Sequence, residues 1–340
     1  MHVVYSDAHR RHDPRHFLVR GRQVASPEVP QRADVLLAAA KAGGHAIAAP
    51  DDFGPGPRAA VHTRAYLAFL ESVHARWREL DGAAEEVVPN VHPNAHMRAY
   101  PQGIVGQAGW HMADTACPIG AGTFAAACAA ADCAVHAAEL VLDGAPAAYA
   151  LARPPGHHAF ADMAGGFCFL NNVAIAARHM AARCGRVAIV DVDVHHGNGT
   201  QGIFYDADDV LFVSLHAEPS NFYPFFAGYA DEVGEGAGAG CNLNLPLAHG
   251  SGDDVFLAAL DRGVAAVREH APGALLVSLG FDAYAGDPLS PLEITTEGFA
   301  AAARALAALG LPTVLVQEGG YDRASLGANL AAFLAAFEGR

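Results

Sequence analysis

The sequence predicts a single-domain α/β fold in three layers, with helices on both faces of a central, mostly parallel β-sheet. Three observations predict it. Short β-branched runs alternate with Ala/Leu-rich helical stretches along the chain. Several runs, such as VAIV and ALLVSL, are apolar along nearly their whole length, which is typical of strands buried on both faces. The 340 residues contain no repeat, charge block or Pro/Ser-rich linker, which favours one domain.

The elements follow from the position of these runs. The expected strands are His2–Ser6, Ala147–Ala152, Arg186–Asp191, Val210–Leu215, Ala274–Gly280 and Thr313–Gln317. The expected helices are Thr123–Leu142, Asn171–Ala182, Asp253–His270, Thr296–Leu309 and Arg323–Phe337. The first of these helices is very apolar, but it carries Asp132, His136 and Glu139, so we expect a buried helix and no membrane span. Residues 81–122 are expected to form a long irregular insertion, a kind of loop that is usually functional or part of an interface.

Composition limits the classes of function. The formal net charge is −15, from 21 Lys+Arg against 36 Asp+Glu, which argues against binding to nucleic-acid phosphates. The six cysteines form no CxxC pair, and the N-terminus has no apolar signal core. We therefore expect a cytoplasmic protein with reduced thiols.

Ionisable residues follow two of the expected strands and predict a metal site. Ligands of open parallel sheets bind beyond the carboxyl ends of the strands. Asp191, Asp193 and His195 follow RVAIV with the same parity, and Asp282 follows ALLVSL. Buried carboxylates are costly without a cation or other partners. Asp193, His195 and Asp282 would give three ligands and one open position, the catalytic zinc pattern. The alternatives are a surface loop for the first motif and a helix cap for Asp282.

Two further strand ends carry groups suited to proton transfer. His157 and His158 follow a double proline that stiffens the turn, and neutral imidazoles are natural proton shuttles near a metal site. The rival interpretation makes both of them metal ligands. Tyr321 follows Gly319 and Gly320 after TVLVQ, and a tyrosine hydroxyl can donate to a developing oxyanion. A purely structural tyrosine is the alternative.

The order of these motifs resembles a known family. RPPGHHA, GGFCFLNN, DVDVHHGNGTQ, VSLH, SLGFDAYAGDP and QEGGY occur in this order, and the likeness runs from VVYSDAH to EGGY. Together they resemble the acetylpolyamine amidohydrolases and histone deacetylases of the arginase/deacetylase fold. The likeness to the ureohydrolases is at the level of the fold only, because those enzymes bind two manganese ions through extra acids and lack the histidine pair and EGGY.

The resemblance implies a zinc-dependent deacetylase. It places one Zn²⁺ on Asp193, His195 and Asp282, although Fe²⁺ or Co²⁺ would suit the same ligands. It makes His158 the general base, has His157 or His158 return a proton to the leaving amine, and has Tyr321 bind the oxyanion.

The resemblance also assigns supports to the two histidines. Asp191 is implied to support His157. The second support is Asn198, where many histone deacetylases have aspartate. Asparagine carries no compensating charge, so we expect His158 to be less readily protonated here, which favours its role as a base.

Structural K⁺ or Na⁺ sites are implied by the resemblance alone. The first would use Asp191, Asp193, the His195 carbonyl, Ser214 and Leu215. The second would use carbonyls of Phe204, Ala207, Val210 and Cys241.

The substrate contacts and the assembly are likewise implied by the resemblance. The slot would be lined by Gly166, Phe167 and Tyr223, with Leu289 near the rim and Asp114 facing a cationic amine; the alternative for both aromatic residues is the core. The insertion is expected to support a homodimer and to narrow the site. Five arginines in HRRHDPRHFLVRGR would repel a polyamine unless they point away or pair with acids such as Asp7, Asp13 and Glu28.

These features favour an enzyme that removes acyl groups from small N-acylated amines such as acetylpolyamines. A protein acetyl-lysine deacetylase and a hydrolase of another amide or ester are the rival enzymes. A binding module without turnover belongs to a different class, and the competent residue at every catalytic position argues against it.

Overall fold

Residues 1–340 are described by a computed structural model, and they fold around one eight-stranded sheet. Its order is β4-β1-β5-β10-β9-β6-β7-β8, and every neighbouring pair is parallel. The strands are β1 (His2–Val4), β4 (Ala46–Ala48), β5 (Ala147–Ala150), β6 (Val187–Asp191), β7 (Val210–Ala217), β8 (Asn242–Leu247), β9 (Ala274–Leu279) and β10 (Thr313–Gln317).

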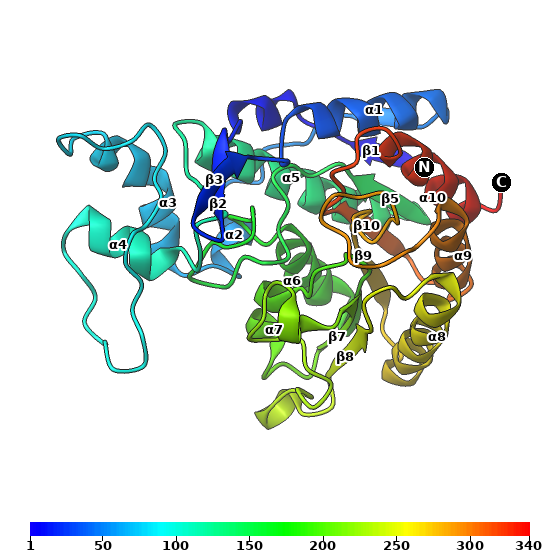
Figure 1. The fold of residues 1–340 in the computed structure, drawn as a ribbon. Coiled ribbons are helices and arrows are strands. Elements are labelled where there is room, and N and C mark those ends of the chain that lie inside the picture. Colours follow the sequence, from blue (N-terminus) through cyan, green and yellow to red (C-terminus); the bar gives the residue numbers. More distant parts are fainter.

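Helices cover both faces of this sheet (Figure 1). One face carries α1 (Gln31–Ala42), α8 (Asp253–His270), α9 (Thr296–Ala307) and α10 (Leu326–Phe337), and the other carries α2 (Gly56–Ala59), α5 (Thr123–Leu142), α6 (Asn172–Cys184) and α7 (Asn198–Phe204). Strand β6 shows why both faces are apolar: Ala188 and Val190 enter one core cluster, whereas Val187 and Ile189 enter the other. The three-layer α/β/α class is therefore confirmed.

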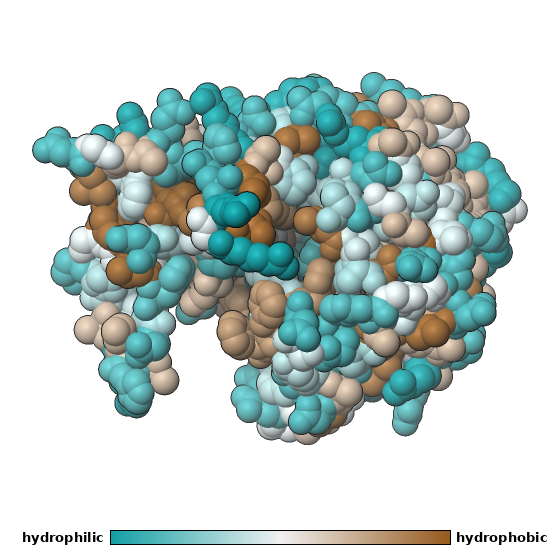
Figure 2. Space-filling view, in the orientation of Figure 1, coloured by the Kyte–Doolittle hydropathy of each residue, from teal (hydrophilic) through white to brown (hydrophobic).

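A second, smaller region flanks the sheet. It contains the antiparallel hairpin β2 (His16–Val19) and β3 (Arg22–Ala25), together with α3 (Arg64–Trp77) and α4 (Ile104–His111). A third apolar cluster joins α3 and α4 to α5 and α6. Figure 2 shows a notch between this region and the body that carries the sheet.

The expectation of a wholly irregular segment at 81–122 was wrong in one part. Helix α4 lies inside it, although its sequence contains Gly106 and Gly109. Ile104 and Ala108 are buried in the third cluster, so tertiary packing outweighs the low helix propensity of glycine. The single-domain assignment and the interface role of this insertion stay predictions.

Helix α5 is long and apolar enough to cross a membrane by length and composition alone. In this fold it packs against α6, and Ala130, Ala134 and Ala138 are buried in the core cluster beneath it. Its apolar character is thus accounted for by burial inside the protein, as the sequence predicts.

Candidate metal centre and active site

The candidate site lies where four adjacent strands end. These strands are β5, β10, β9 and β6, which neighbour one another in the sheet. Strand β5 leads to the histidine pair, β10 to Glu318–Tyr321, β9 to Asp282, and β6 runs into Asp191, Asp193 and His195. Because the strands are parallel, all four loops emerge at the same edge of the sheet, although they come from distant parts of the chain.

Asp193, His195 and Asp282 form a buried cluster whose potential ligand atoms all lie within 4.8 Å of one another. Nδ1 of His195 lies 3.2 Å from Oδ1 of Asp193 and 3.2 Å from Oδ2 of Asp282. Backbone amides orient the two carboxylates: Gly319 N–H donates to Asp193 Oδ2, and Val194 N–H donates to Asp282 Oδ1. The three predicted metal ligands are therefore brought together.

The chemistry of this cluster fits a divalent cation. Oδ2 of Asp282 is buried, and the His195 ring at 3.2 Å makes no well-aligned hydrogen bond with it. A buried carboxylate oxygen in this position is costly unless it has a further partner. Burial and the neighbouring Asp193 raise the pKa of Asp282 to about 7. A Cβ atom on Gly319 would lie 2.0 Å from Asp282 Oδ2, and one on Gly280 would lie 2.1 Å from Asp193 Oδ2. The two glycines therefore let the backbone approach both carboxylates closely.

His157 and His158 lie side by side, with ring centroids 4.0 Å apart, and each has its predicted support. Nδ1 of His157 is 2.9 Å from Asp191 Oδ2, and Nδ1 of His158 is 2.7 Å from Asn198 Oδ1. Neither ring belongs to the Asp193, His195 and Asp282 cluster, although His157 lies in a second buried group with Cys168 and Glu318 whose potential ligand atoms are equally close together. His158 belongs to neither group, which disfavours the rival interpretation of both histidines as ligands.

The two histidines differ in electrostatics. Burial alone would lower the pKa of His157, but the carboxylates of Asp193 and Asp191 outweigh it and raise that pKa well above its usual value. Burial, together with the neighbouring His157 and His195, lowers the pKa of His158 well below its usual value. Without the charge of a bound cation, His157 is thus the proton-holding ring and His158 the neutral one.

Tyr321 is held beside this cluster by its backbone and by its ring. Its N–H donates to Asp287 Oδ2 at 2.6 Å, and the Arg32 guanidinium lies 4.6 Å from the ring centroid. Gly320 precedes it with φ +117°, a left-handed conformation that glycine accepts at little cost. Burial raises the pKa of Tyr321 well above its usual value, so the phenol keeps its proton and can donate it in a hydrogen bond.

Glu318 is a supporting residue that sequence reasoning missed. It is fully buried, and its Oε2 accepts hydrogen bonds from the N–H groups of Gly156 and His157 at 2.6 and 3.1 Å. Burial raises its pKa to about 7. The only sequence signal was its place before the two glycines of EGGY, where it read as part of a turn.

A buried ionic cluster beneath the EGGY turn was also missed. Glu28 accepts from Arg32 at 2.9 Å and from Arg153 at 2.8 Å, and all three side chains are almost fully buried. Arg32 also donates to the carbonyls of Gly320 and Glu318. Its members are up to 125 residues apart in the chain, so no local pattern could reveal it.

Of the predicted slot residues, Gly166 and Tyr223 lie against His158, whereas Phe167 lies against Tyr321. The Phe167 ring lies 5.7 Å from Tyr321 and 5.4 Å from Phe17 between centroids, and the Tyr223 ring stands perpendicular to His158 at 4.9 Å. Gly166 and Phe167 both have positive φ, at +50° and +68°. Leu289 is half-buried on the loop that carries Asp287. The aromatic residues thus line the site, although Phe167 is also largely buried.

The monovalent-cation sites stay predictions. Asp191 and Ser214 are register partners in β6 and β7, so the first proposed set is contiguous. In the second set, the Phe204 carbonyl already accepts from Ala207 N–H, and the Cys241 carbonyl accepts from Phe212 N–H.

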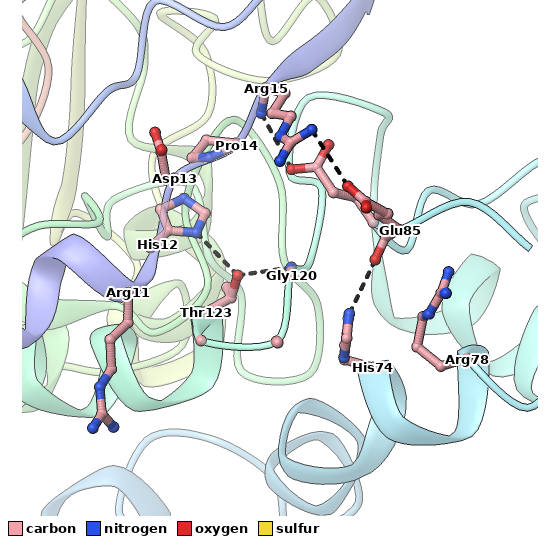
Figure 3. A pocket seen from close by; sticks show the side chains of 13 residues that line it. Arg11, His12, Asp13, Pro14, Arg15, His74, Arg78, Glu85, Gly120 and Thr123 are labelled. Carbon is pink, nitrogen blue, oxygen red and sulfur yellow. Dashed lines mark hydrogen bonds and ion pairs between the residues drawn. The ribbon is translucent and has the colours of Figure 1, made fainter.

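Two of the five N-terminal arginines pair with acids. Arg10 pairs with Asp34, and Arg15 pairs with Glu85 at 3.5 Å. Figure 3 shows Arg15 and Glu85 at a polar cavity of about 370 Å³, which lies between the N-terminal loop and the start of α5 and contains no member of the metal cluster. Glu28, one of the acids expected to pair there, is instead buried against Arg32 and Arg153.

Comparison with known proteins identifies the family to which this chain belongs. Residues 26–337 match the model of the histone deacetylase domain. The chain belongs to the histone deacetylase family. This member is 50% identical over 330 residues to the acetylpolyamine amidohydrolase of Burkholderia pseudomallei, covering 96% of this chain and 95% of that one. It is 46% identical to acetylpolyamine amidohydrolase 1 of Pseudomonas aeruginosa, with 99% and 98% covered.

Solved structures of the histone deacetylase family agree. The crystal structure of the acetylpolyamine aminohydrolase from B. pseudomallei superposes with a TM-score of 0.95 at 49% identity, covering 99% of this chain and 98% of that one. The arginase/deacetylase fold is therefore shown. Family membership implies a catalytic metal, and the buried Asp193, His195 and Asp282 cluster is a set of residues able to hold it.

Proposed function

We propose that this histone deacetylase family member is a zinc-dependent amidohydrolase that removes acetyl groups from small acylated amines, above all acetylpolyamines. The observation that carries the proposal is the buried Asp193, His195 and Asp282 cluster beside two supported histidines and a protonated tyrosine. The relatives named above as acetylpolyamine amidohydrolases, which match over nearly their whole lengths, support the substrate class.

The metal ligands are proposed to be the carboxylates of Asp193 and Asp282 and the imidazole of His195. A zinc ion held by these residues would supply Lewis acidity to the amide carbonyl and to the attacking water. Three protein ligands are the number typical of a catalytic zinc site. The same ligands would accept Fe²⁺ or Co²⁺, so the donor set alone does not select zinc.

The remaining steps belong to the protein's own side chains. His158, neutral because burial lowers its pKa, accepts the proton of the attacking water at Nε2, since its Nδ1 faces Asn198. His157, held by Asp191, carries the proton that returns to the leaving amine, either directly or through His158. The Tyr321 hydroxyl donates a hydrogen bond to the oxyanion that forms on the substrate.

The aromatic residues beside the catalytic groups favour a narrow, linear substrate. The Tyr223 ring packs against His158, and the Phe167 ring packs against Tyr321. A chain of methylene groups fits such walls, whether it belongs to a polyamine or to an acetyl-lysine. The net charge of −15 favours a small cationic amine, and two of the five N-terminal arginines, Arg10 and Arg15, pair with acids.

Rates on acetylputrescine and acetylspermidine, compared with rates on acetyl-lysine peptides, test the substrate class. We expect the acetylated polyamines to have the higher kcat/KM. A wide preference for peptides would favour the rival assignment as a protein deacetylase. Turnover of neither substrate class would contradict both.

Metal dependence needs a separate test. Chelation should abolish activity, and Zn²⁺ should restore it. Asp282→Ala should lower both the bound zinc measured by elemental analysis and the activity, because it removes one of three ligands. Wild-type levels of zinc in this variant would contradict the proposed ligand set.

The cellular setting is part of the same proposal. We infer a homodimer built through the insertion at residues 81–122, structural K⁺ or Na⁺ ions near β6 and β7, and a cytoplasmic location without nucleic-acid or membrane partners. Sedimentation of the purified protein tests the dimer. Thermal melts in KCl, NaCl and tetramethylammonium chloride test the monovalent ions.

A further inference from the structure

Asp114 joins two walls of the slot. Its Oδ2 atom accepts a hydrogen bond from the Tyr223 hydroxyl at 2.6 Å and another from Gly166 N–H at 3.0 Å. Its Oδ1 atom accepts from Ala116 N–H at 2.7 Å. One carboxylate thus ties together the insertion, the glycine turn before Phe167 and the loop that carries Tyr223. Hydrogen bonds to a charged acceptor are among the stronger ones in proteins.

The groups that Asp114 holds are in direct contact with the reacting histidine. The Tyr223 ring stands perpendicular to His158 at 4.9 Å and lies 6.1 Å from His195. A Cβ atom on Gly166 would lie 2.4 Å from His158 Cδ2 and 2.9 Å from the Tyr223 hydroxyl. These groups are closely packed, so a displacement of Tyr223 or Gly166 would also displace the His158 ring.

We infer that Asp114 is a positioning residue, which keeps His158 in place through Tyr223 and Gly166 and does not receive the free amine of the substrate. The inference rests on the proposed deacetylation. If Asp114 turned to an ammonium group, the Tyr223 hydroxyl and the Gly166 N–H would lose their acceptor, and unmet donors in a desolvated site are costly. The effect of Asp114 therefore belongs to the reaction itself and does not depend on the charge of the substrate.

Two substrates separate the two roles. Acetylputrescine carries an ammonium group at its far end, and N-pentylacetamide has the same length with a methyl group there. The variants are Asp114→Ala, Asp114→Asn, Tyr223→Phe and the double variant Asp114→Ala/Tyr223→Phe. Asp114→Asn removes the charge but keeps an oxygen that can accept from Tyr223. Asp162→Asn is the matched control, because its exposed side chain is close in sequence to the same turn and makes no hydrogen bond.

The positioning role predicts equal losses on both substrates. Asp114→Ala should lower kcat by about tenfold or more on each, as expected for the loss of a charge-assisted hydrogen bond. Asp114→Asn should recover much of that loss. The double variant should be little worse than Asp114→Ala, because both changes break the same link. Asp162→Asn should leave both rates unchanged.

An amine-binding role predicts a different pattern. Asp114→Ala and Asp114→Asn would then raise KM equally for acetylputrescine alone, and Tyr223→Phe would have little effect; this pattern would overturn the inference. If the wild type hydrolyses only acetylputrescine, the two Asp114 variants are compared on that substrate. Recovery of activity in Asp114→Asn would support the positioning role, and equal effects of the two variants would overturn it. If the wild type turns over neither substrate, the proposed function fails and the inference falls with it.

Discussion

The side chain of Asn198 supports His158, because its Oδ1 lies 2.7 Å from Nδ1 of that ring. Because burial, His157 and His195 lower the pKa of His158, its basic form persists to lower pH than for a free histidine. Asn198→Asp would add a negative charge next to Nδ1 and raise this pKa. The acidic limb of the kcat/KM profile should therefore move to higher pH.

The pH–rate profile of the variant on acetylputrescine is the measurement. It should be compared with that of Asn172→Asp, a second buried asparagine, whose amide donates to the Pro154 carbonyl and does not contact His158. A profile of Asn198→Asp that coincides with the wild type would show that His158 does not set the acidic limb.

Tyr321 offers the second prediction at the residue scale. Burial keeps its phenol protonated, and Tyr321→Phe removes the hydrogen-bond donor while leaving the ring against Phe167. Loss of one oxyanion donor typically lowers kcat by about 10²–10³-fold. We expect KM to change little, because the bond is needed mainly in the transition state. A variant with the wild-type kcat would assign the oxyanion to another group.

Most candidate site residues could be predicted because each follows a strand end with a distinct chemical type. Asp193, His195 and Asp282 meet in one cluster as expected. Glu318 escaped notice because its function is to accept backbone hydrogen bonds, which leave no mark on the surrounding sequence. The same holds for the partners of Asp114, which lie 52 and 109 residues away.

At the scale of elements, the Glu28, Arg32 and Arg153 cluster connects the start of α1, the loop after β5 and the EGGY turn. Glu28→Gln would leave two buried guanidinium groups without their counter-charge. Breaking a buried ion pair from one side typically costs about 3–5 kcal/mol. The control is Glu297→Gln, which removes an exposed partner of Arg304 and should cost about 1 kcal/mol or less. Urea unfolding of both variants measures the difference, and equal midpoints would contradict this role.

The pH dependence of this cluster has a definite sign. Burial alone would raise the pKa of Glu28, but Arg153 and Arg32 outweigh it and lower that pKa. A carboxyl whose pKa is depressed on folding contributes stability above its unfolded pKa and loses it as the pH falls through the folded value. Glu28→Gln should therefore destabilise the protein at neutral pH. The difference in the free energy of unfolding between the variant and the wild type should become smaller in acid.

Elements were predictable where packing leaves a pattern in the sequence. Strands that are buried along their whole length and mostly apolar, such as β9 and β10, were located almost to the residue. The three-residue edge strand β4 has mostly exposed side chains, and β8 contains Pro246, so neither shows the signature of a buried strand. Helix α10 begins at Leu326, three residues later than expected, because Asp322 and Ser325 form a turn first.

At the scale of the whole molecule, the charge of −15 should affect the capture of a cationic substrate. Added salt shortens the Debye length from about 30 Å at 0.01 M to about 3 Å at 1 M. We expect kcat/KM for acetylputrescine to fall as NaCl is raised at constant KCl, and the value for N-pentylacetamide to stay nearly flat. An identical response of both substrates would show that the overall field does not act on the amine.

The placement of β10 has a consequence for how the protein is made. This strand, at Thr313–Gln317, inserts between β5 and β9. A nascent chain on the ribosome can complete neither the pairing of these strands nor the turn that carries Tyr321 until residues 313–321 have been synthesised. No molecule therefore gains its catalytic centre before this segment has been made, and fragments that end before Thr313 should be unable to hydrolyse substrate.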